Sequence, residues 1–246
     1  MRVLVACEES QTVCKAFREK GHEAFSCDIV PCSGGHPEWH IQDNVLNHLN
    51  DGWDLMIAHP PCTYLANSGV SWLFKSKKKP SLPEYVIRDM YNYSGPDWEK
   101  IDEERFEKMH AAAMFFAELV TADIPHIAIE NPIQHKYAKY RVECSVSYIV
   151  QERQPMDLRR NIWFEELEKP QIVQPYEFGH PESKKTCLLL KNLPELKATN
   201  NVKEEMLKLP KNQQQRLHYL PPSDNRTKLR AKTFEGIAKA MANQWG

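Results

Sequence analysis

Residues 53–62, Trp-Asp-Leu-Met-Ile-Ala-His-Pro-Pro-Cys, decide the fold that we expect for this chain. Their short apolar run follows Asp51-Gly52 and stops at two prolines, which is typical of a buried parallel strand whose carboxyl end opens into a loop. In open α/β sheets, ligands bind at that end of the strands. Because two prolines fix two φ angles and remove two backbone donors, the loop that carries Cys62 should be stiff. A nucleophile held in one geometry and an ordinary buried free cysteine explain Cys62 equally well at this point.

The segments on either side alternate between strand and helix patterns. Strands are expected at residues 2–7, 23–27, 127–129 and 186–190, and helices at residues 12–20, 45–49, 102–121 and 233–245. This alternation predicts an α/β fold with a doubly wound, mostly parallel sheet. Residues 135–175 show no clean periodicity, and residues 197–226 form a polar stretch without an expected element.

Length and composition narrow the class of protein. The chain has 246 residues, and we expect residues 1–246 to form a single domain. Its charge is nearly balanced, with 32 Lys plus Arg against 33 Asp plus Glu, so nucleic-acid binding must rest on local patches. The cysteines lack the paired spacing of zinc sites, and no apolar stretch approaches the roughly 20 residues that span a bilayer. We therefore expect a cytoplasmic protein with free thiols and without a signal peptide, a metal site or a membrane partner.

A second strand end carries a carboxylate. Glu130-Asn131-Pro132 follows the strand expected at residues 127–129, so Glu130 and Cys62 are expected at the same edge of the sheet. Carbon 5 of cytosine becomes nucleophilic when a thiolate adds to carbon 6, and a carboxylate hydrogen-bonded to N3 stabilises the charge that the ring acquires. Taken alone, Glu130 is explained better as a strand-end carboxylate beside a helix N-terminus. The combination with Cys62 favours chemistry on a cytosine ring.

In the order of these motifs, the chain resembles the cytosine-5 DNA methyltransferases, and more closely the short phage and prophage members of that family. Pro60-Pro61-Cys62 matches the Pro-Pro-Cys motif, and Glu130-Asn131-Pro132 matches the Glu-Asn-Val motif with proline in the third place. The resemblance covers most of the chain and implies a Rossmann-like methyltransferase fold. It also implies that Cys62 is the nucleophile, that Glu130 contacts the base, and that S-adenosylmethionine donates the methyl group.

The implied cofactor site departs from the family in its first loop. The family has glycines there, whereas this chain has Glu8-Glu9-Ser10-Gln11-Thr12, which lets backbone amides approach a cofactor less freely. Asp28 ends the second strand, where an acid accepts hydrogen bonds from ribose hydroxyls, and Asp43 matches the acidic position near the adenine. Each of these acids is also explained as a structural cap. The expected cofactor residues are Cys7, Glu8, Ser10, Gln11, Asp28, Ile29, Asp43, Asn44 and Pro60.

The implied partner is DNA, with the target cytosine flipped out of a duplex or already single-stranded, because the thiol must reach a stacked base. Lys185 stands where the family has an assisting arginine, although lysine lacks the planar fork of arginine. A basic and aromatic insertion at about residues 65–100 and a reduced target-recognition region at about 133–225 would hold the DNA, but a solvated surface explains their charges equally well. The expected substrate-binding residues are Pro61, Thr63, Lys77, Lys78, Asn131 and Pro132. Further candidate contacts are Tyr137, Tyr140, Arg141, Tyr148, Arg153, Arg159, Arg160 and Trp163.

Two other functions remain open. The same nucleophile could act on RNA or on a free cytidine nucleotide, and activity without a polymer would identify that case. The chain could instead be a non-catalytic phage protein that binds DNA or a protein partner; the glycine-poor first loop supports this, and failure to bind S-adenosylmethionine would favour it. An amino-methyltransferase is disfavoured, because those enzymes need Asp or Asn before the two prolines and an aromatic residue after them. This chain has His59 and Cys62 in those places.

Overall fold

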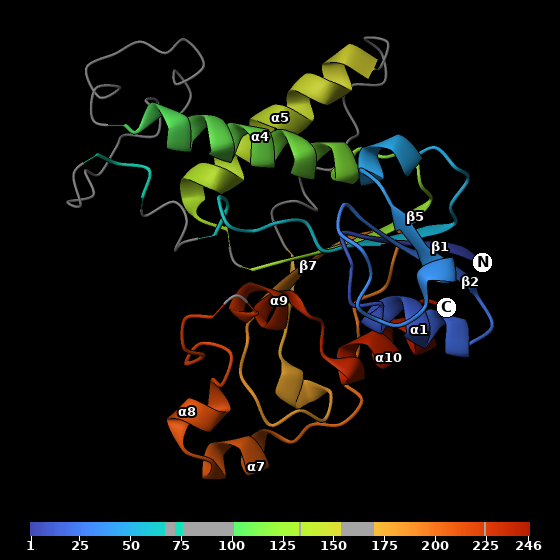
Figure 1. The fold of residues 1–246 in the computed structure, drawn as a ribbon, viewed down its shortest axis with the longest axis vertical. Helices are drawn as coiled ribbons and strands as arrows, with labels where there is room; N and C mark the ends of the chain where they lie inside the picture. The colour runs from blue at the N-terminus through green and yellow to red at the C-terminus, as the bar shows by residue number, and fades with distance from the viewer. Residues whose placement is uncertain (67–71, 76–100, 133, 154–169, 224) are drawn as a thin grey trace. The chain divides into compact units, whose positions relative to one another are not determined.

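The computed structural model describes the chain except for residues 67–71, 76–100, 133, 154–169 and 224 (Figure 1). The described residues form two compact units. The first comprises Met1–His59, Ala122–Glu130 and Glu168–Gly246. The second comprises Pro60–Thr121 and Asn131–Leu167.

One seven-stranded sheet forms the centre of the first unit. Its strands are β1 (Arg2–Ala6), β2 (Glu23–Asp28), β3 (His40–Gln42), β4 (Leu55–Ala58), β5 (His126–Asn131), β6 (Gln171–Val173) and β7 (Thr186–Lys191). They are arranged in the order β3-β2-β1-β4-β5-β7-β6. The first five strands in this order, β3, β2, β1, β4 and β5, pair in parallel with their neighbours, and β6 pairs antiparallel with β7. The predicted α/β class and mostly parallel sheet are therefore confirmed.

The strand order places a switch point beside β1. The chain runs outward from β1 to β2 and β3, and then returns to pair β4 with the other side of β1, where Leu4 is opposite both Phe25 and Met56. Ligands of doubly wound sheets bind outside the carboxyl ends of the strands at such a point. Since β1, β2, β4 and β5 are parallel, the residues that follow them meet at one edge of the sheet.

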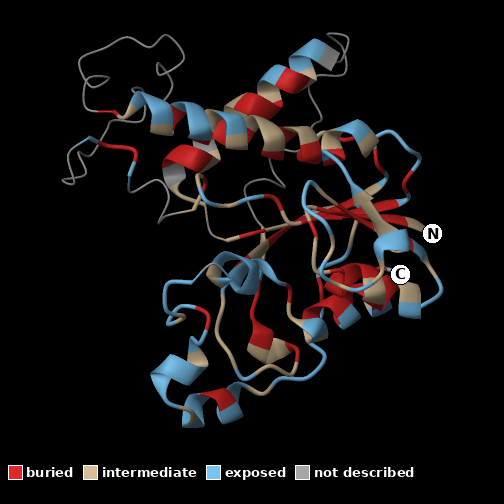
Figure 2. Ribbon diagram, in the orientation of Figure 1, coloured by how far each residue is buried: buried red, intermediate tan, exposed pale blue. Residues whose placement is uncertain are grey.

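The core of the first unit lies between the sheet and two helices, α1 (Thr12–Glu19) and α10 (Glu235–Gln244). Phe17 of α1 and Met241 of α10 are fully buried in one cluster with Val3 and Val5 of β1. Figure 2 shows the ribbon coloured by burial. The alternation of Val3 and Val5 is the two-residue period of a strand, and the apolar face of each helix covers it. Both helices agree with the sequence prediction, although α10 begins two residues later than the expected residue 233.

Shorter helices complete the first unit: the 3-10 helices η1 (Pro37–Trp39), η2 (Val45–His48) and η6 (Pro175–Glu177), with α7 (Lys203–Lys208), α8 (Lys211–Gln214) and α9 (Arg226–Ala231). The helix expected at residues 45–49 is thus a 3-10 turn capped by Asn44, whose side chain accepts a hydrogen bond from the backbone of Leu46. The polar stretch expected at residues 197–226 contains α7 and α8, which the sequence analysis did not anticipate.

The second unit contains the helix pair α4 (Glu103–Val120) and α5 (Lys136–Arg153). Asp102 caps α4 by accepting a hydrogen bond from the backbone of Arg105 at 2.9 Å, which confirms the expected helix at residues 102–121. Helix α5 was not predicted. Its buried face carries Arg141 and Ser145 among apolar residues, so the hydrophobic period is interrupted. No helix within the described ranges is both long and apolar enough to cross a membrane.

Close packing at the start of α10 gives a first prediction. Gly236 donates its backbone N–H to Nε2 of His180 at 2.9 Å, and a methyl group on its α-carbon would overlap the carbonyl oxygen of Phe178. We expect Gly236→Ala to lower the free energy of unfolding by roughly 1–3 kcal/mol, as overpacking does. Chemical denaturation measures this change. Lys239→Ala, at an exposed position of the same helix, should stay within about 0.5 kcal/mol of the wild type, and equal effects of the two variants would contradict the prediction.

Candidate functional site

The carboxylate of Glu130, at the end of β5, is the centre of the candidate site. Its side chain is only 12% exposed and lies 2.8 Å from Nδ1 of His59, which follows β4 and is 10% exposed. Thr233 donates its hydroxyl to the same oxygen, Oε2, at 3.1 Å. The ammonium group of Lys184 lies 3.9 Å from the other oxygen, Oε1. Three separate segments of the first unit therefore hold one buried carboxylate.

Electrostatics keep this carboxylate ionised. Burial raises the pKa of Glu130, but the hydrogen bond and charge of His59, with Lys184 and Thr233, outweigh burial and lower it to about 2. Burial likewise lowers the pKa of His59, yet the hydrogen bond and charge of Glu130 and the charge of Glu8 raise it overall. The two residues therefore form a buried, hydrogen-bonded pair, in which the pKa of the carboxyl group is lowered and that of the imidazole is raised.

The pair makes stability depend on pH. Glu130 has a lowered pKa, so its contribution is complete above its ordinary value of 4.5 and is lost as the pH falls toward 2. His59 has a raised pKa, so its contribution is complete below its ordinary value of 6.5 and is lost as the pH rises through the raised value. The pair consequently contributes most to the stability of the folded protein between about pH 4.5 and 6.5.

We expect His59→Asn to cost about 3 kcal/mol near pH 6, because it removes one charge of a buried pair. The difference from the wild type should shrink as the pH rises above 6.5, where the wild type also loses the charge. Denaturant unfolding between pH 5 and 9 measures both effects. Glu130→Gln serves as the matched variant. It should also reduce the dependence of the free energy of unfolding on pH above 6.5. The prediction is wrong if the stability difference between His59→Asn and the wild type does not change with pH.

The first loop obtains its shape without glycine. Cys7 and Gln11 adopt left-handed backbone conformations, with φ of 59° and 56°. Such conformations cost a non-glycine residue about 1–2 kcal/mol. Gln11 offsets this cost, because its fully buried side chain donates to the carbonyl of His36 at 2.8 Å and accepts from the backbone of His36 at 3.1 Å. Gly34 permits this packing, since a Cβ atom there would lie 2.5 Å from that of Gln11.

Several expected cofactor residues of this loop form hydrogen bonds within the protein. The buried carboxylate of Glu8 accepts hydrogen bonds from the backbone of Val13 at 2.7 Å and of Cys14 at 3.1 Å, and so caps α1. Burial raises the pKa of Glu8, although the charge of His59 and the backbone hydrogen bonds oppose the shift. The hydroxyl of Ser10 lies 3.1 Å from that of Thr12. The side chains of Glu8 and Gln11 are thus occupied within the protein, and the loop presents mainly its backbone.

Three other features of the first unit fit an adenosyl amino acid. Asp28 is half-exposed at the end of β2 and accepts one hydrogen bond, from the backbone of Val30 at 3.2 Å. Ile29 is 73% exposed beside it, which is unusual for an isoleucine and suits contact with a flat ring. In the first loop, Oε2 of Glu9 is buried without a hydrogen-bond partner among the described residues. An ammonium group would satisfy this oxygen, and the sequence analysis did not select Glu9.

Asp43 and Asn44 lie after β3. Asp43 accepts hydrogen bonds from the backbone of Asn44 at 2.7 Å and from Nε2 of His48 at 3.1 Å, and the hydrogen bond from Asn44 is the main reason that its pKa is lowered. Asn44 caps η2. The cap of η2 is thus Asn44, for which only a cofactor role was predicted, whereas Asp43, for which capping was the alternative, is hydrogen-bonded beside it.

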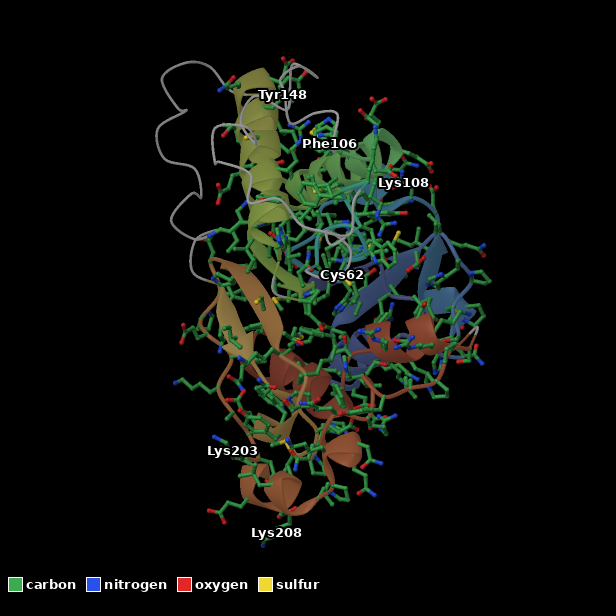
Figure 3. The ribbon with its side chains drawn as sticks, turned by 90° about the vertical axis from the view of Figure 1, so that its left-hand side faces the viewer. Cys62, Phe106, Lys108, Tyr148, Lys203 and Lys208 are labelled. Atoms are coloured by element: carbon green, nitrogen blue, oxygen red, sulfur yellow. The ribbon has the colours of Figure 1, made fainter. Side chains whose placement is uncertain are left out.

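Cys62 belongs to the second unit, where it is half-buried in a turn (Figure 3). Its carbonyl oxygen accepts hydrogen bonds from the backbone of Leu65 at 3.0 Å and of Ala66 at 2.9 Å. Pro60 before it is buried, whereas Pro61 and Thr63 are exposed on either side. The residue that carries the thiol is thus part of a hydrogen-bonded turn.

Asn131 and Pro132 follow Glu130 directly. Asn131 is 4% exposed, and neither its amide nitrogen nor its amide oxygen has a hydrogen-bond partner in the part of the chain that the structure describes. Buried amides are normally paired, so this side chain has unused capacity for one donor and one acceptor interaction. Pro132 is half-buried.

Before β7, the structure brings Lys184 rather than Lys185 to Glu130. Lys185 is exposed, because successive residues of an extended chain point in opposite directions. His59 and Thr233 were not among the predicted site residues. The only signal for His59 was its place between β4 and the two prolines, and nothing local marked Thr233.

Several predicted DNA contacts are tested by burial. Arg141 is buried, donates from Nε to Nδ1 of His110 at 3.1 Å and stacks over Phe106, so its predicted exposure to nucleic acid is wrong. Tyr137 is buried as well, whereas Tyr148 on α5 is 52% exposed (Figure 3). The remaining predicted contacts lie outside the described residues or have side chains outside them: Lys77, Lys78, Tyr140, Arg153, Arg159, Arg160 and Trp163.

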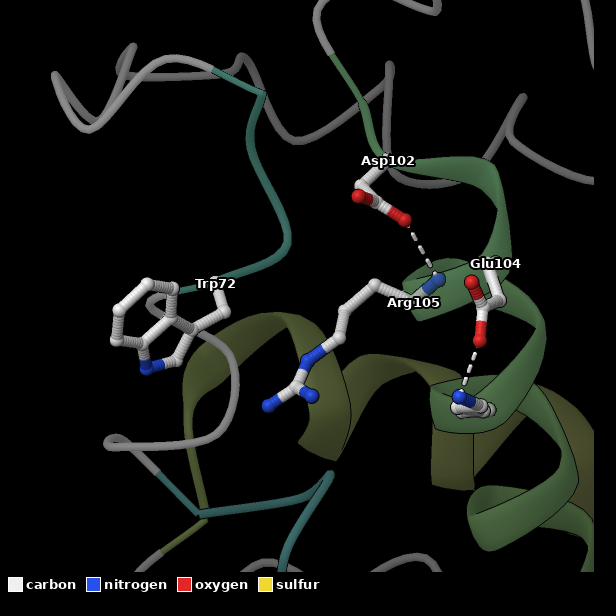
Figure 4. Close-up of a pocket in the computed structure, with 5 residues that line it drawn as sticks. Trp72, Asp102, Glu104 and Arg105 are labelled. Atoms are coloured by element: carbon white, nitrogen blue, oxygen red, sulfur yellow. Dashed lines mark hydrogen bonds and ion pairs between the residues drawn. The ribbon is translucent and has the colours of Figure 1, made fainter.

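A pocket of about 360 Å³ opens beside the start of α4, lined by Trp72, Asp102, Glu104, Arg105 and Lys108 (Figure 4). Its charged groups are used locally, since Asp102 caps the helix and Glu104 pairs with Lys108. Among the described residues, none of those expected to bind cofactor or substrate lines this pocket.

The seven-stranded sheet, with its order and its antiparallel pair of strands, is typical of the Rossmann-like fold of S-adenosylmethionine-dependent methyltransferases. No protein-family model matches the chain, and no curated protein matches it. Among solved structures, it is similar to one from E. coli named as a DNA modification methyltransferase encoded within a prophage, with 15% sequence identity and a TM-score of 0.42 over 85% of this chain and 55% of that chain. It is also similar to the methyltransferase EhMeth of Entamoeba histolytica, with 15% identity and a TM-score of 0.45 over 82% of this chain and 57% of that chain. The chain thus spans little more than half of each structure, and these likenesses concern the fold alone.

Proposed function

We propose that the protein transfers a methyl group from S-adenosylmethionine to carbon 5 of cytosine in DNA. The observation that carries this proposal is the buried, ionised carboxylate of Glu130, held by His59, Thr233 and Lys184 at the end of β5. Three partners from distant segments fix the carboxylate in one orientation, which suits a group that must meet a base in one geometry. The motif Pro60-Pro61-Cys62 after β4 supplies the nucleophile of the same reaction.

Each residue has a role in this proposal. The thiolate of Cys62 adds to carbon 6 of the cytosine ring, and Glu130 binds the ring at N3, where negative charge develops. The unpaired amide of Asn131 offers a donor and an acceptor to the same substrate. Pro61, Thr63 and Pro132 would shape the pocket. Lys184 takes the place that the sequence analysis gave to Lys185, because it is the lysine beside Glu130.

S-adenosylmethionine supplies an activated methyl group in this reaction. Asp28 would accept hydrogen bonds from its ribose, and Ile29 would contact its adenine. Oε2 of Glu9 would accept a hydrogen bond from its ammonium group, and the backbone between Cys7 and Gln11 would follow its methionine portion.

Cofactor binding gives a direct test of the role of Asp28. We expect Asp28→Asn to weaken binding of S-adenosylmethionine roughly 10-fold to 100-fold, because hydrogen bonds to a charged group contribute about 1.5–3 kcal/mol. Isothermal titration calorimetry measures the dissociation constant. The matched control is Asp54→Asn, at the opposite end of the parallel strands, where the carboxylate accepts from the backbone of Arg2 at 2.7 Å and binding should not change. Equal dissociation constants for the wild type and Asp28→Asn would remove Asp28 from the cofactor site.

The reaction itself is tested by transfer of labelled methyl from S-adenosylmethionine to unmodified duplex and single-stranded DNA, with nucleoside analysis of the product. We expect 5-methylcytosine with the wild type and at least about a 10³-fold loss of rate with Cys62→Ala, because the variant lacks the thiolate proposed to form the covalent adduct. Cys144→Ala, which removes another half-buried thiol of the same unit, should retain the activity.

Other outcomes of this assay separate the alternatives. Label found on RNA or on free cytidine nucleotides, but not on DNA, would show that the substrate is not DNA. Cys62 would remain the assigned nucleophile. Methylation that persists in Cys62→Ala would show that the assigned nucleophile is wrong. A protein that neither binds S-adenosylmethionine nor transfers methyl would be a binding protein built on the methyltransferase fold.

A further inference from the structure

His59 has an unused nitrogen. Its Nδ1 is engaged with Glu130 at 2.8 Å, while its Nε2 is buried without a hydrogen-bond partner among the described residues. Only 10% of the side chain is exposed. The proposed function assigns no task to this residue, although it contacts the carboxylate on which that function rests.

The proposed contact between Glu130 and cytosine lacks a proton. An ionised carboxylate only accepts hydrogen bonds, and N3 of a neutral cytosine also only accepts them. The two groups therefore repel each other unless a proton is placed between them. Thr233 and Lys184 contact the carboxylate as well, but the hydroxyl of Thr233 is a very weak acid, and the ammonium group of Lys184 is 3.9 Å away from Oε1.

The surroundings of His59 favour a proton on its ring. The charged groups that face the imidazole are the carboxylates of Glu130 and Glu8 and the more distant ammonium group of Lys184. Glu130 supplies both a hydrogen bond and a negative charge, and the net effect on His59 is a raised pKa. An imidazolium at this position has one N–H directed at Glu130, so the proton is already on the hydrogen bond that leads to the carboxylate.

We infer that His59 is the positioning residue of Glu130: it orients the carboxylate and holds the proton that Glu130 presents to N3 of the target cytosine. This inference rests on the proposed function and assigns the source of a proton that the reaction requires. A structural ion pair is the competing explanation, and it predicts effects on stability alone.

The proton balance of the step is complete. When the Cys62 thiolate adds to carbon 6, the S–C6 bond forms and the electron pair of the C5–C6 double bond moves toward N3. A proton passes from His59 to the Glu130 carboxyl and from that carboxyl to N3, which leaves His59 neutral, Glu130 ionised and the ring adduct uncharged. After carbon 5 has been methylated and has lost its proton to a base, the thiolate is expelled and the N3 proton returns to His59. No oxidant or reductant is involved.

The test compares two variants of the residues that bind Oε2 of Glu130. His59→Asn keeps an N–H donor near the carboxylate but cannot hold an ionisable proton, whereas Thr233→Val removes the other hydrogen bond and leaves the imidazole in place. The maximal rate of methyl transfer is measured from pH 5.5 to 9.5 with the folded, full-length protein. Calorimetric titration with S-adenosylmethionine confirms that each variant still binds the cofactor.

For the wild type, we expect the rate to fall about tenfold per pH unit above the pKa of His59. His59→Asn should be slower by roughly 10²–10⁴-fold, the usual contribution of general acid–base catalysis, and should lack this alkaline limb. Thr233→Val should be slower but keep the limb. An alkaline limb that persists in His59→Asn would overturn the inference, because the proton would then come from another group.

A second measurement does not depend on activity. ¹⁵N NMR of the histidine rings, with His59 assigned from the signal missing in His59→Asn, reports the protonation of the imidazole in the free protein. We expect His59 to be an imidazolium at pH 6.5 and to become neutral at lower pH in Glu130→Gln than in the wild type. A neutral His59 at pH 6.5 in the wild type would overturn the inference even if DNA is methylated. An imidazolium in a protein that methylates no substrate would instead reject the proposed function while confirming the state of the pair.

Discussion

The buried hydrogen bond between His59 and Glu130 is the interaction on which the candidate site depends. It joins the residue after β4 to the last residues of β5, and so it ties together the carboxyl ends of two adjacent parallel strands. Two charges at this depth are tolerated because each satisfies the other and because Thr233 and Lys184 complete the surroundings of the carboxylate. The pair depends on the pairing of β4 with β5, and it lies at the edge of the sheet where ligands of doubly wound sheets bind.

The first loop, residues 7–12, is also held in place by buried hydrogen bonds. A backbone that turns back toward the edge of the sheet needs left-handed positions, and this chain places Cys7 and Gln11 there instead of glycines. Buried hydrogen bonds from Gln11 to the loop at His36, and the cap that Glu8 forms on α1, stabilise this conformation. The absence of glycines in the sequence therefore does not mean that the loop has lost its shape, but it does mean that side chains within the loop are committed to holding it.

The accuracy of the sequence analysis followed the strength of the local pattern. β1, β4, α4 and α10 were predicted because buried strands are apolar runs and packed helices have an apolar face. Helix α5 was missed because Arg141 and Ser145 are buried on its packed side, bonded to His110 and to the backbone, so the pattern reads as polar. The short helices α7 and α8 were missed because few of their residues are buried, which leaves little periodicity to detect.

The sequence by itself determined the alternation of strands and helices, the parallel sheet, and the presence of a cysteine and a glutamate directly after two of its strands. Those features depend on local periodicity and on proline, whose effects act within a few residues. Only the tertiary structure decided which groups surround Glu130. His59 lies 71 residues before Glu130, and Thr233 lies 103 residues after it. Contacts over such separations leave no local pattern, because they are created by the order in which the strands pair.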